Sequence, residues 1–595
     1  MLHDSQDRFY RLPTGPVPVG GRVLLRIDAP EAIRAYVRLW VEDRERLLPM
    51  KCAGNGVFER ELTLTKRGVT WYYFRLMLPG GKTVSYGNPE NLGGAGKESV
   101  YEPASYQITV YDPEKLCPPE WMRSAVMYQI FLDRFACSGE NGSCGRRMHA
   151  SWDEDPVNER TEDGDSRADD FFGGDLKGIE SRLDYLSGLG ITALYLNPIF
   201  ASVSNHRYNT ADYSRIDPML GTEKDFEELC REAQKRGIRV ILDGVFSHTG
   251  SDSVYFNKNG TYGAEGAYRS RNSKYASWYS FTDWPDEYEC WWGFKTLPNV
   301  NENDPSFTKY IAGPNGILRR WLEKGASGWR LDVADELPVS FIGKVKKRIK
   351  SFDPDAALIG EVWEDPSRKV AYGELRCYCD GTTLDGTMNY PLRDMVIAFF
   401  TGREDAEGFV RRYRSMCENI PRAFLEACMN LLGSHDKPRI ISVLANAGNM
   451  EPERRFRRPV VLTDDEYRRG KRRFIAAWKL ICSLPGMPCL YYGDEAGMTG
   501  MSDPYNRGTY PWGGEDKELT EAIRSAILER NSTRVLTCGD VRVEAAGKDI
   551  LVVTRFREDA EQDGPGTRIY AFNRSAEDKT YEGMTIPAEG GACIR

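Results

Sequence analysis

Acidic side chains with catalytic potential stand where apolar runs of the sequence end. Asp332 closes the run Gly-Trp-Arg-Leu-Asp, Glu361 closes Ile-Gly-Glu, and Asp436 closes Gly-Ser-His-Asp. A carboxylate at the end of an apolar strand is partly buried, so it needs donors to stay ionised or else holds a proton. One ionised and one protonated carboxyl group is the division of labour used in glycoside hydrolysis.

The neighbours of two of these acids favour that division. Arg330 precedes Asp332 by two positions, so both side chains point to the same side of a strand. An arginine there would hold Asp332 ionised, as a nucleophile requires. Val362 and Trp363 follow Glu361, an apolar setting that would raise its pKa towards the range of roughly 6–7 that suits a general acid. The alternative is a structural Arg330–Asp332 ion pair and a Glu361 exposed in a loop.

Three of the five histidines follow predicted strands. His206 lies in Asn-His-Arg-Tyr, His248 ends the segment that begins at Asp243, and His435 directly precedes Asp436. Any one of them could be a satisfied structural histidine. Together they indicate chemistry, because the active sites of barrel enzymes lie at the C-terminal ends of the strands.

The elements that must position these residues are short apolar runs that alternate with amphipathic stretches. Helical patterns lie between most of the runs, as in Asp225–Lys235 and Ile317–Lys324. Eight strands alternating with helices predict a (β/α)8 TIM barrel, with a doubly wound sheet as the alternative. The expected strands are Val126–Phe131, Ala193–Leu196, Val240–Leu242, Gly328–Leu331, Ala357–Ile359, Thr387–Tyr390, Met429–Leu432 and Cys489–Tyr492.

Further domains are expected on both sides of the barrel and within it. Short strand candidates separated by turn signals predict an N-terminal β-sandwich, and similar strands end the chain. An aromatic, Gly/Asn/Asp-rich stretch after the third strand is too long for one helix and predicts an inserted subdomain. The expected division is an N-terminal carbohydrate-binding-like β-sandwich at 1–117, barrel at 118–248, inserted subdomain B at 249–305, barrel at 306–515, and a C-terminal β-sandwich at 516–595.

Composition excludes several other functions. The 595 residues include 80 Lys+Arg and 88 Asp+Glu, a net charge of −8, and the basic clusters at Arg454–Arg458 and Arg468–Arg473 are surrounded by acids. We therefore expect solvated faces there and no nucleic-acid binding. No run of 18 apolar residues predicts a membrane helix, and Met1–Arg11 is too polar for a secretory signal. The 14 cysteines are scattered without a CxxC pair, which favours a reducing cytoplasm over zinc binding.

Four segments carry a specific resemblance. Asp243-Gly-Val-Phe-Ser-His248, Gly328-Trp-Arg-Leu-Asp332, Gly360-Glu-Val-Trp363 and Ser434-His-Asp436 resemble, in the same order, the four signature segments of the alpha-amylase family, glycoside hydrolase family 13. The resemblance is strong over residues 118–515. The sandwich before the barrel, and Glu336 four residues after Asp332, are similar to the neopullulanase/cyclomaltodextrinase/maltogenic amylase-like group.

The resemblance implies a role for each matching residue. Asp332 would be the nucleophile, Glu361 the general acid and then the base, and Asp436 the group that grips sugar hydroxyls and stabilises the transition state. Arg330 would orient Asp332, Tyr208 would stack on the sugar, and Trp363 would stack on an acceptor sugar. The residues implied in substrate binding are Tyr208, His206, Asp243, His248, Arg330, Glu336, Trp363, His435, Asp503 and Arg507, the last two as a clamp one sugar unit beyond the reacting one.

The resemblance leaves open whether the protein binds a metal ion. Gly173 and Asp175 match half of a calcium site known in relatives, whereas Ser247 and Cys137 stand where calcium-binding relatives often have Asn. The expectation is that no cofactor is required and that Ca²⁺ binding stays an alternative.

The expected function is that of a retaining hydrolase that cleaves α-1,4 glucosidic bonds in maltooligosaccharides, cyclodextrins, pullulan or starch. Cleavage of α-1,6 bonds in addition is left open. The alternatives are an α-glucan transglycosylase and a non-catalytic α-glucan-binding protein on the same fold. The expected partners are the glucan substrate and a second copy in a homodimer, because the N-terminal sandwich in this group often covers a partner's site. A sandwich docked on its own barrel is the alternative to the dimer.

Overall fold

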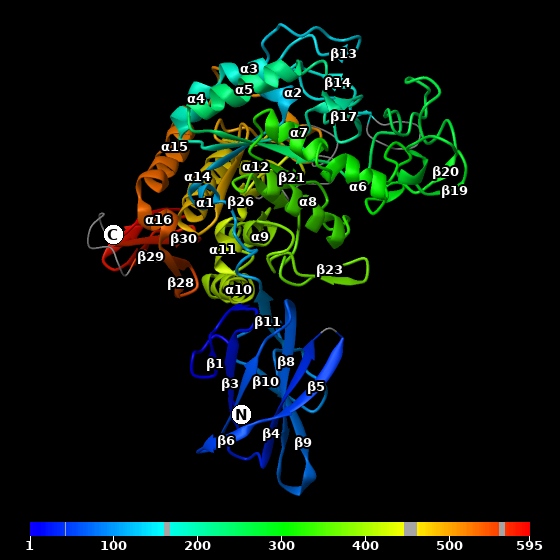
Figure 1. The fold of residues 1–595 in the computed structure, drawn as a ribbon. Helices are drawn as coiled ribbons and strands as arrows, with labels where there is room; N and C mark the ends of the chain where they lie inside the picture. The colour runs from blue at the N-terminus through cyan, green and yellow to red at the C-terminus, as the bar shows by residue number, and fades with distance from the viewer. Residues whose placement is uncertain (42, 160–166, 446–460, 558–565) are drawn as a thin grey trace. The chain divides into compact units, whose positions relative to one another are not determined.

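The computed structural model describes every residue except 42, 160–166, 446–460 and 558–565 (Figure 1). It divides into two compact units. The first comprises residues 1–118, 364–386 and 405–427, and the second comprises 119–363, 387–404 and 428–595. The basic cluster expected at 454–458 lies outside the described residues.

Eight parallel strands form the centre of the second unit. Their order in the sheet is β25-β22-β21-β18-β15-β12-β27-β26, and a parallel bridge between Met388 and Met429 links its two ends. The predicted (β/α)8 barrel is thereby confirmed, and the doubly wound sheet is excluded. The strands are β12 (Met127–Ile130), β15 (Ala193–Leu196), β18 (Arg239–Gly244), β21 (Gly328–Leu331), β22 (Ala357–Gly360), β25 (Gly386–Thr387), β26 (Met429–Leu431) and β27 (Met487–Tyr491).

The sixth strand is shorter than predicted. The apolar pattern favoured a strand to Tyr390, but β25 ends at Thr387 and helix α9 (Tyr390–Phe400) begins three residues later. The side chain of Asn389 accepts a hydrogen bond from the backbone N–H of Leu392, and Pro391 stands in the first turn. An asparagine cap followed by proline is a helix start signal, so this local chemistry overrides the apolar pattern.

Helices cover the barrel on its outside, as α4, α5 and α15 show in Figure 1. Helix α5 begins with a capping box between Thr222 and Asp225 and buries Phe226 and Leu229. Apolar side chains at this spacing form one helix face, which packs on the strands. The helices of this unit, with α9, are α1 (Glu120–Ser124), α2 (Leu132–Phe135), α3 (Leu176–Ser181), α4 (Leu183–Leu189), α5 (Glu223–Lys235), α6 (Pro305–Ala312), α7 (Ile317–Glu323), α8 (Val339–Phe352), α12 (Ile440–Leu444), α14 (Asp464–Ser483), α15 (Lys517–Ser532) and α16 (Arg534–Cys538).

The chain between β18 and α6 forms the expected insertion. It contains the 3-10 turns η2 (Ala276–Trp278) and η3 (Trp291–Gly293) and the short strands β19 (Phe281–Asp283) and β20 (Glu287–Tyr288). Phe256 lies among four aromatic rings, those of Tyr268, Tyr279, Phe281 and Tyr288, at 5.6, 4.9, 5.8 and 4.7 Å between centroids. Aromatic packing thus holds together a segment that has little regular structure.

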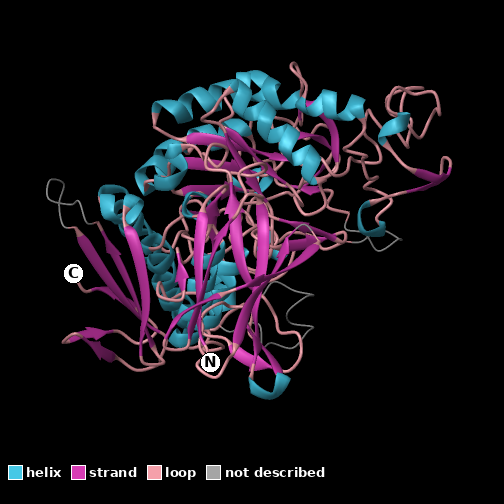
Figure 2. Ribbon diagram, turned by 60° about the horizontal axis from the view of Figure 1, so that its bottom comes forward, coloured by secondary structure: helices cyan, strands magenta, loops and turns pink. Residues whose placement is uncertain are grey.

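The end of the chain forms a small antiparallel sheet, seen beside the end marked C in Figure 2. Its order is β28-β29-β30-β33, and a separate hairpin pairs β31 with β32. Ile550, Val552, Ala571 and Ile586 form its core. The strands are β28 (Asp540–Ala546), β29 (Ile550–Phe556), β30 (Thr567–Asn573), β31 (Lys579–Tyr581), β32 (Met584–Ile586) and β33 (Gly591–Cys593).

The first unit contains two sheets, whose strands are mostly antiparallel, packed around one core. One sheet has the order β1-β3-β7-β6, and the other is built on β8, which pairs with β4, β9 and β11. Alternate residues of β3, such as Val23, Leu25 and Ile27, are fully buried, which is the pattern of a strand with one face on the core. The strands of the two sheets are β1 (Arg11–Leu12), β2 (Val17–Pro18), β3 (Arg22–Asp28), β4 (Arg34–Val41), β5 (Arg44–Pro49), β6 (Lys51–Gly54), β7 (Val57–Thr63), β8 (Gly68–Met77), β9 (Thr83–Gly87), β10 (Lys97–Ser99) and β11 (Tyr106–Tyr111).

Two surface expectations concern membranes and nucleic acids. None of the described helices is long and apolar enough to cross a bilayer. In the second basic cluster, Arg468 contacts Asp465 at 2.6 Å, Lys471 contacts Asp516 at 2.8 Å and Arg473 contacts Glu589 at 2.6 Å. These acids neutralise the charges that a phosphate backbone would need.

Candidate active site

Asp332 and Glu361 stand side by side at the ends of neighbouring barrel strands. Each directly follows its strand, β21 or β22, and the register pairs Leu331 with Gly360. The backbone N–H of Glu361 donates to the carbonyl of Leu331 at 3.0 Å, so the parallel pairing continues to the acid itself. Because paired strands lie about 4.8 Å apart, the fold brings the two carboxyl groups together.

Arg330 joins three carboxyl groups at this point. Its Nη1 lies 2.8 Å from Asp332 Oδ1 and 2.7 Å from Asp243 Oδ1, and its Nη2 lies 2.8 Å from Glu361 Oε2. All four side chains are buried. A guanidinium that bridges Asp332 and Glu361 through two nitrogens is compatible with the separation of roughly 5–5.5 Å found in retaining glycosidases.

We expected Arg330 to hold Asp332 ionised, but the surroundings of Asp332 favour its protonated form. Burial raises the pKa of Asp332 well above its usual range, and Arg330 opposes that shift without overcoming it. Burial likewise raises the pKa of Asp243, against the same guanidinium. One guanidinium cannot neutralise three buried carboxylates. We therefore expect the three carboxyl groups around Arg330 to share at least one proton.

The surroundings of Glu361 are more polar than the sequence suggested. Trp363 turns its indole N–H towards Oε1 at 2.9 Å, and the backbone N–H of Val333 donates to Oε2 at 2.7 Å. The setting of Glu361 is therefore not only the apolar one expected from Val362 and Trp363, because the tryptophan supplies a donor as well as a ring. The alternative of a Glu361 exposed in a loop is wrong, since this residue is 5% exposed.

Tyr208 connects the acids to His435. Its hydroxyl donates to Asp243 Oδ2 at 2.8 Å and lies 2.6 Å from His435 Nε2, and the two rings are parallel within 4°. The hydroxyl of Tyr195 donates to the same oxygen of Asp243 at 2.7 Å. The carboxylate of Asp243 is thus occupied by hydrogen bonds from other residues of the protein. This favours a role in holding the site together over direct chemistry.

Tyr195 and two further residues of this network, Gln129 and Asn197, were not predicted. Gln129 Nε2 lies 2.8 Å from His435 Nδ1 and 3.2 Å from Asn197 Oδ1, and Asn197 Nδ2 donates to the hydroxyl of Tyr208 at 2.7 Å. A signal was available for Gln129, because it is the one strongly polar residue in the apolar run Val126–Phe131. Asn197 directly follows β15, the position at which functional residues of a barrel stand.

The three site histidines are neutral at physiological pH. Burial lowers the pKa of His248 to about 4 and that of His206 to about 3, and it lowers the pKa of His435 well below its usual range. Neutral imidazoles can donate and accept hydrogen bonds with hydroxyl groups, whereas proton transfer near neutral pH is left to the carboxyl groups.

Asp436 lies beside Arg507, at 3.9 Å between Oδ1 and Nη2. Arg507 also contacts Asp503 at 3.1 Å and donates from Nε to the carbonyl of His435 at 3.0 Å. Arg507 is only 9% exposed. The alternative of a surface ion pair is therefore wrong for Arg507, and its contact with the backbone gives it a structural role besides any contact with substrate.

Trp363 is mounted at the rim of the site with one side of its ring occupied. Its ring lies 4.6 Å from that of Tyr390 at 17°, and the ammonium of Lys437 lies 3.5 Å from the indole and 5.2 Å from the Tyr390 ring. These distances place Lys437 on the same side of the indole as Tyr390. Trp363 is 41% exposed, so its other side is open to a ligand, and neither neighbour was predicted.

Glu336 lies beyond Asp332 and accepts a hydrogen bond at 2.8 Å from Nε1 of Trp292, a residue of the inserted segment that was not predicted either. Burial raises the pKa of Glu336, and the indole N–H opposes the shift.

The residues expected to match a calcium site do not fit that ion. The carboxylate of Asp175 caps helix α3 through Gly178 N–H at 2.6 Å and accepts from the Ser138 hydroxyl at 2.5 Å and the Asn141 amide at 3.1 Å. Gly173 donates its N–H to Asp133. Ca²⁺ needs six to eight oxygen ligands, whereas Asp175 is occupied by hydrogen-bond donors. Among the residues that the structure describes, no group of three or more His, Cys, Asp or Glu is placed to hold a metal.

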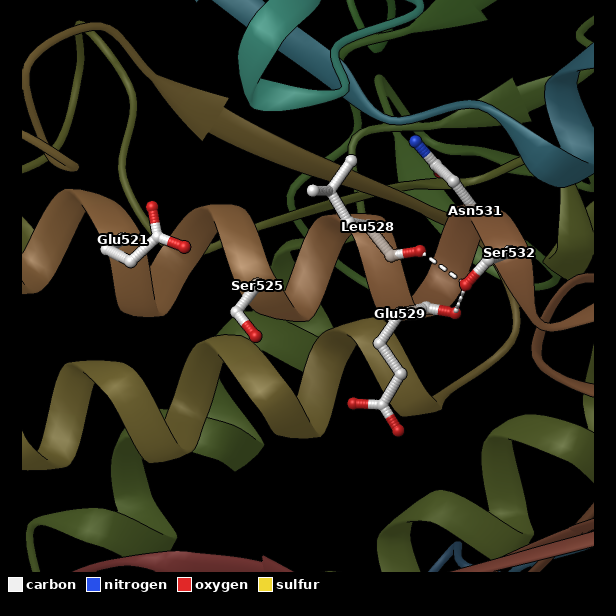
Figure 3. A pocket seen from close by; sticks show the side chains of 6 residues that line it. All are labelled: Glu521, Ser525, Leu528, Glu529, Asn531 and Ser532. Carbon is white, nitrogen blue, oxygen red and sulfur yellow. Dashed lines mark hydrogen bonds between the residues drawn. The ribbon is translucent and has the colours of Figure 1, made fainter.

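A hollow elsewhere in the second unit contains none of the predicted residues. It lies along α15 and is lined by Glu521, Ser525, Leu528, Glu529, Asn531 and Ser532 (Figure 3). The Ser532 hydroxyl donates back to carbonyls of its own helix, and Asn531 donates to the carbonyl of Gly190. These side chains serve helix packing and offer no pair of reactive groups.

Buried carboxyl groups at the ends of neighbouring strands of a (β/α)8 barrel are typical of barrel enzymes whose catalytic groups are carboxyl groups. Residues 129–537 match the family described as "Alpha amylase, catalytic domain". The chain belongs to the alpha-amylase family. It is 33% identical to neopullulanase 2 of Thermoactinomyces vulgaris over 583 residues, which cover 96% of this chain and 88% of the relative.

Two further comparisons concern longer relatives and solved structures. The chain is 36% identical to an amylopullulanase of Thermoanaerobacterium saccharolyticum over 93% of its own length, but it spans only 46% of that relative. The fold is similar to that of cyclic alpha-maltosyl-(1→6)-maltose hydrolase from Arthrobacter globiformis, with a TM-score of 0.67 and 28% identity, over 80% of this chain and 99% of that one.

Proposed function

We propose that the chain is a retaining α-glucan hydrolase that cleaves α-1,4 bonds, and also α-1,6 bonds, by double displacement. The observation that carries the proposal is the bridge of Arg330 between Asp332 and Glu361 at the ends of neighbouring strands. The names of the relatives, which include amylopullulanase and neopullulanase, support α-glucans as the substrate class.

In the first step, an oxygen of Asp332 attacks the anomeric carbon, and the bond from that carbon to the glycosidic oxygen breaks. Glu361 gives its proton to the departing oxygen. In the second step, the ionised Glu361 removes a proton from water, the water oxygen attacks the anomeric carbon, and the ester bond to Asp332 breaks. Two inversions leave the product with the α configuration.

Asp436, His248 and His435 would bind hydroxyl groups of the reacting sugar, and Tyr208 would stack on it. Arg330 would hold Asp332 and Glu361 in place, with Asp243 as its anchor. Positive charge develops on the sugar in the transition state, and the carboxyl groups around it would stabilise that charge.

Asp332→Asn and Glu361→Gln test the assignment. Each should lower kcat on maltotriose by at least about 100-fold, because each removes one of the two reacting groups. The circular dichroism spectrum should stay that of the native protein. In wild type, proton NMR of a digest should show the α-anomer first, and the β-anomer first would contradict the mechanism. A panel of pullulan, starch, cyclodextrin and maltotriose would rank the substrates.

Neither step above uses a metal ion, so we propose that no cofactor is required. Prolonged treatment with a calcium chelator should leave the activity unchanged, and a loss that added Ca²⁺ restores would contradict this.

We also propose a cytoplasmic homodimer. The 14 cysteines, which form no disulfide among the described residues, support a reducing compartment. Cell fractionation would test that location. Light scattering at micromolar concentration tests the dimer, and a monomer mass would contradict it. The division into an N-terminal sandwich at 1–117, a barrel at 118–248 and 306–515, an inserted subdomain at 249–305 and a C-terminal sandwich at 516–595 stays a prediction.

A further inference from the structure

Lys437 carries a positive charge beside the site without the partners that such a charge normally has. It follows Asp436 in the loop after β26 and is half-buried. Within the described part of the chain, its ammonium forms no hydrogen bond and no ion pair. A lysine ammonium is strongly hydrated, so its partial removal from water without a partner costs stability. An ion pair therefore does not explain why a lysine stands here.

Two aromatic rings are the close neighbours of this charge. Nζ of Lys437 lies 3.5 Å from the centroid of the Trp363 ring and 5.2 Å from that of Tyr390. The face of an aromatic ring attracts a cation at such distances, and indole attracts it most strongly. The backbone of Lys437 is also fixed, because its N–H donates to the carbonyl of Ser434 at 3.2 Å and its carbonyl accepts from Asn506 Nδ2 at 3.0 Å.

The indole that carries the charge is bonded to the general acid of the proposed mechanism. Nε1 of Trp363 donates to Oε1 of Glu361 at 2.9 Å. A cation on the ring face draws electron density from the indole, so the N–H group becomes a stronger donor. A hydrogen bond donated to a carboxylate favours its ionised form, and Lys437 strengthens that preference through the ring.

The charged groups that face Lys437 come from three places. Helix α9 contributes Arg393 and Asp394, the end of β22 contributes Glu361, and Asp436 is the preceding residue. Burial lowers the pKa of Lys437, and the charge of Arg393 adds to that shift. The charges of Asp394, Asp436 and Glu361 oppose it. Because such coupling is mutual, the ammonium favours the ionised forms of these acids.

We propose that Lys437 is a positioning residue, which holds the indole of Trp363 on Glu361 and strengthens the hydrogen bond between them. The inference rests on the proposed function, because it concerns the acid that protonates the leaving oxygen. Its consequence is that Glu361 loses its proton at a lower pH than it would without the charge of Lys437. The activity should therefore end earlier on the alkaline side.

Lys437→Met tests this, because it removes the charge and keeps an unbranched side chain of similar length. The basic limb of the kcat/KM profile on maltotriose reports the loss of the proton that the leaving oxygen needs. In Lys437→Met this limb should move to higher pH by about half a unit, the shift that corresponds to one cation–π contact. Lys437→Gln, which is also uncharged, should move it in the same way. Lys437→Arg keeps a cation over the ring, so its limb should stay in place.

A second background tests the route through the indole. Trp363→Phe keeps a ring beside Tyr390 and lacks the N–H group. Adding Lys437→Met to Trp363→Phe should move the basic limb by less than about half of the shift seen in the wild-type background. The difference between the two shifts is the part that the indole N–H transmits to Glu361.

Lys258 provides a matched control. It is half-buried in the inserted segment, and its Nζ lies 5.8 Å from the centroid of the Tyr288 ring. Lys258→Met therefore also removes a cation from an aromatic ring. It should change the unfolding temperature at least as much as Lys437→Met does and leave the pH profile as in wild type.

A basic limb that stays in place in both Lys437→Met and Lys437→Gln would overturn the inference, and so would an equal movement in Lys437→Arg. An undiminished shift in the Trp363→Phe background would show that the charge acts without the indole and would overturn it as well. These results leave the proposed function intact, because wild type still cleaves maltotriose. A wild-type protein that does not cleave maltotriose would overturn the proposed function and this inference together.

Discussion

Nη1 of Arg330 lies 2.7 and 2.9 Å from the two oxygens of Asp243, its register partner on the neighbouring strand. The hydroxyls of Tyr195 and Tyr208 both donate hydrogen bonds to Oδ2 of the same carboxylate. Asp243 therefore cannot move towards substrate without breaking four contacts. It anchors the guanidinium that bridges Asp332 and Glu361, which makes it a positioning residue.

Asp243→Asn keeps the shape of this anchor and removes its charge. The kcat on maltotriose should fall by up to about 100-fold, because a small displacement of the reacting carboxyl groups costs a rate factor of that order. The charge of Asp243 helps to raise the pKa of Asp332. Its removal should lower that pKa, so the acidic limb of the kcat/KM profile should move to lower pH.

Tyr195→Phe serves as the control, because it removes one hydrogen bond to Asp243 and no charge. Its acidic limb should stay in place. A limb that moves equally in both variants, or to higher pH in Asp243→Asn, would contradict the role given to the Asp243 charge.

A buried acid outside the site should make stability depend on pH. Glu495 is fully buried, accepts hydrogen bonds from Tyr128 and Tyr185, and has its pKa raised by burial from 4.5 to about 7. Between these two pH values the native state binds a proton that the unfolded state has lost. The free energy of unfolding should therefore be highest below pH 4.5 for this group and fall as pH rises to 7, by up to about 3 kcal/mol.

Urea denaturation at pH 5 and pH 7.5, with wild type and Glu495→Gln, measures this contribution. The variant cannot ionise, so it should lose less stability than wild type between the two pH values. Identical losses in both proteins would show that Glu495 ionises normally in the folded state.

The sequence predicts the barrel well because its strands are buried on both faces and read as continuous apolar runs. It predicts the acids for a related reason, since a charged residue at the end of such a run is conspicuous. It does not predict the start of α9, where the cap formed by Asn389 competes with the apolar pattern. It also misses Trp292, because contact with Glu336 depends on the path of the inserted segment, which contains little periodic structure.

Asp503 offers a cleaner test of the donor-side clamp than Arg507. Its side chain is 48% exposed and contacts Arg507 at 3.1 Å, whereas Arg507 is buried against the backbone. Asp503→Ala should raise KM for maltotriose several-fold, with little change in kcat. Its unfolding temperature should stay within about 1–2 °C of wild type, because exposed ion pairs contribute at most about 1 kcal/mol.

Arg507→Ala, by contrast, should lower the unfolding temperature, because it leaves the carbonyl of His435 without one of its donors. Unaltered maltotriose kinetics in Asp503→Ala would refute the clamp.

Trp363 offers both an open ring face and an N–H group, and two variants separate them. If the open face stacks on an acceptor sugar, it helps that sugar to compete with water for the glycosyl-enzyme. Trp363→Ala should then shift the products from transfer oligosaccharides to simple hydrolysis at high maltotriose. Trp363→Phe keeps a ring on Tyr390 and loses only the hydrogen bond to Glu361, so its transfer-to-hydrolysis ratio, measured by chromatography, should stay near that of wild type. Equal ratios in wild type and Trp363→Ala would assign Trp363 to packing, and equal falls in both variants would assign the effect to the N–H group.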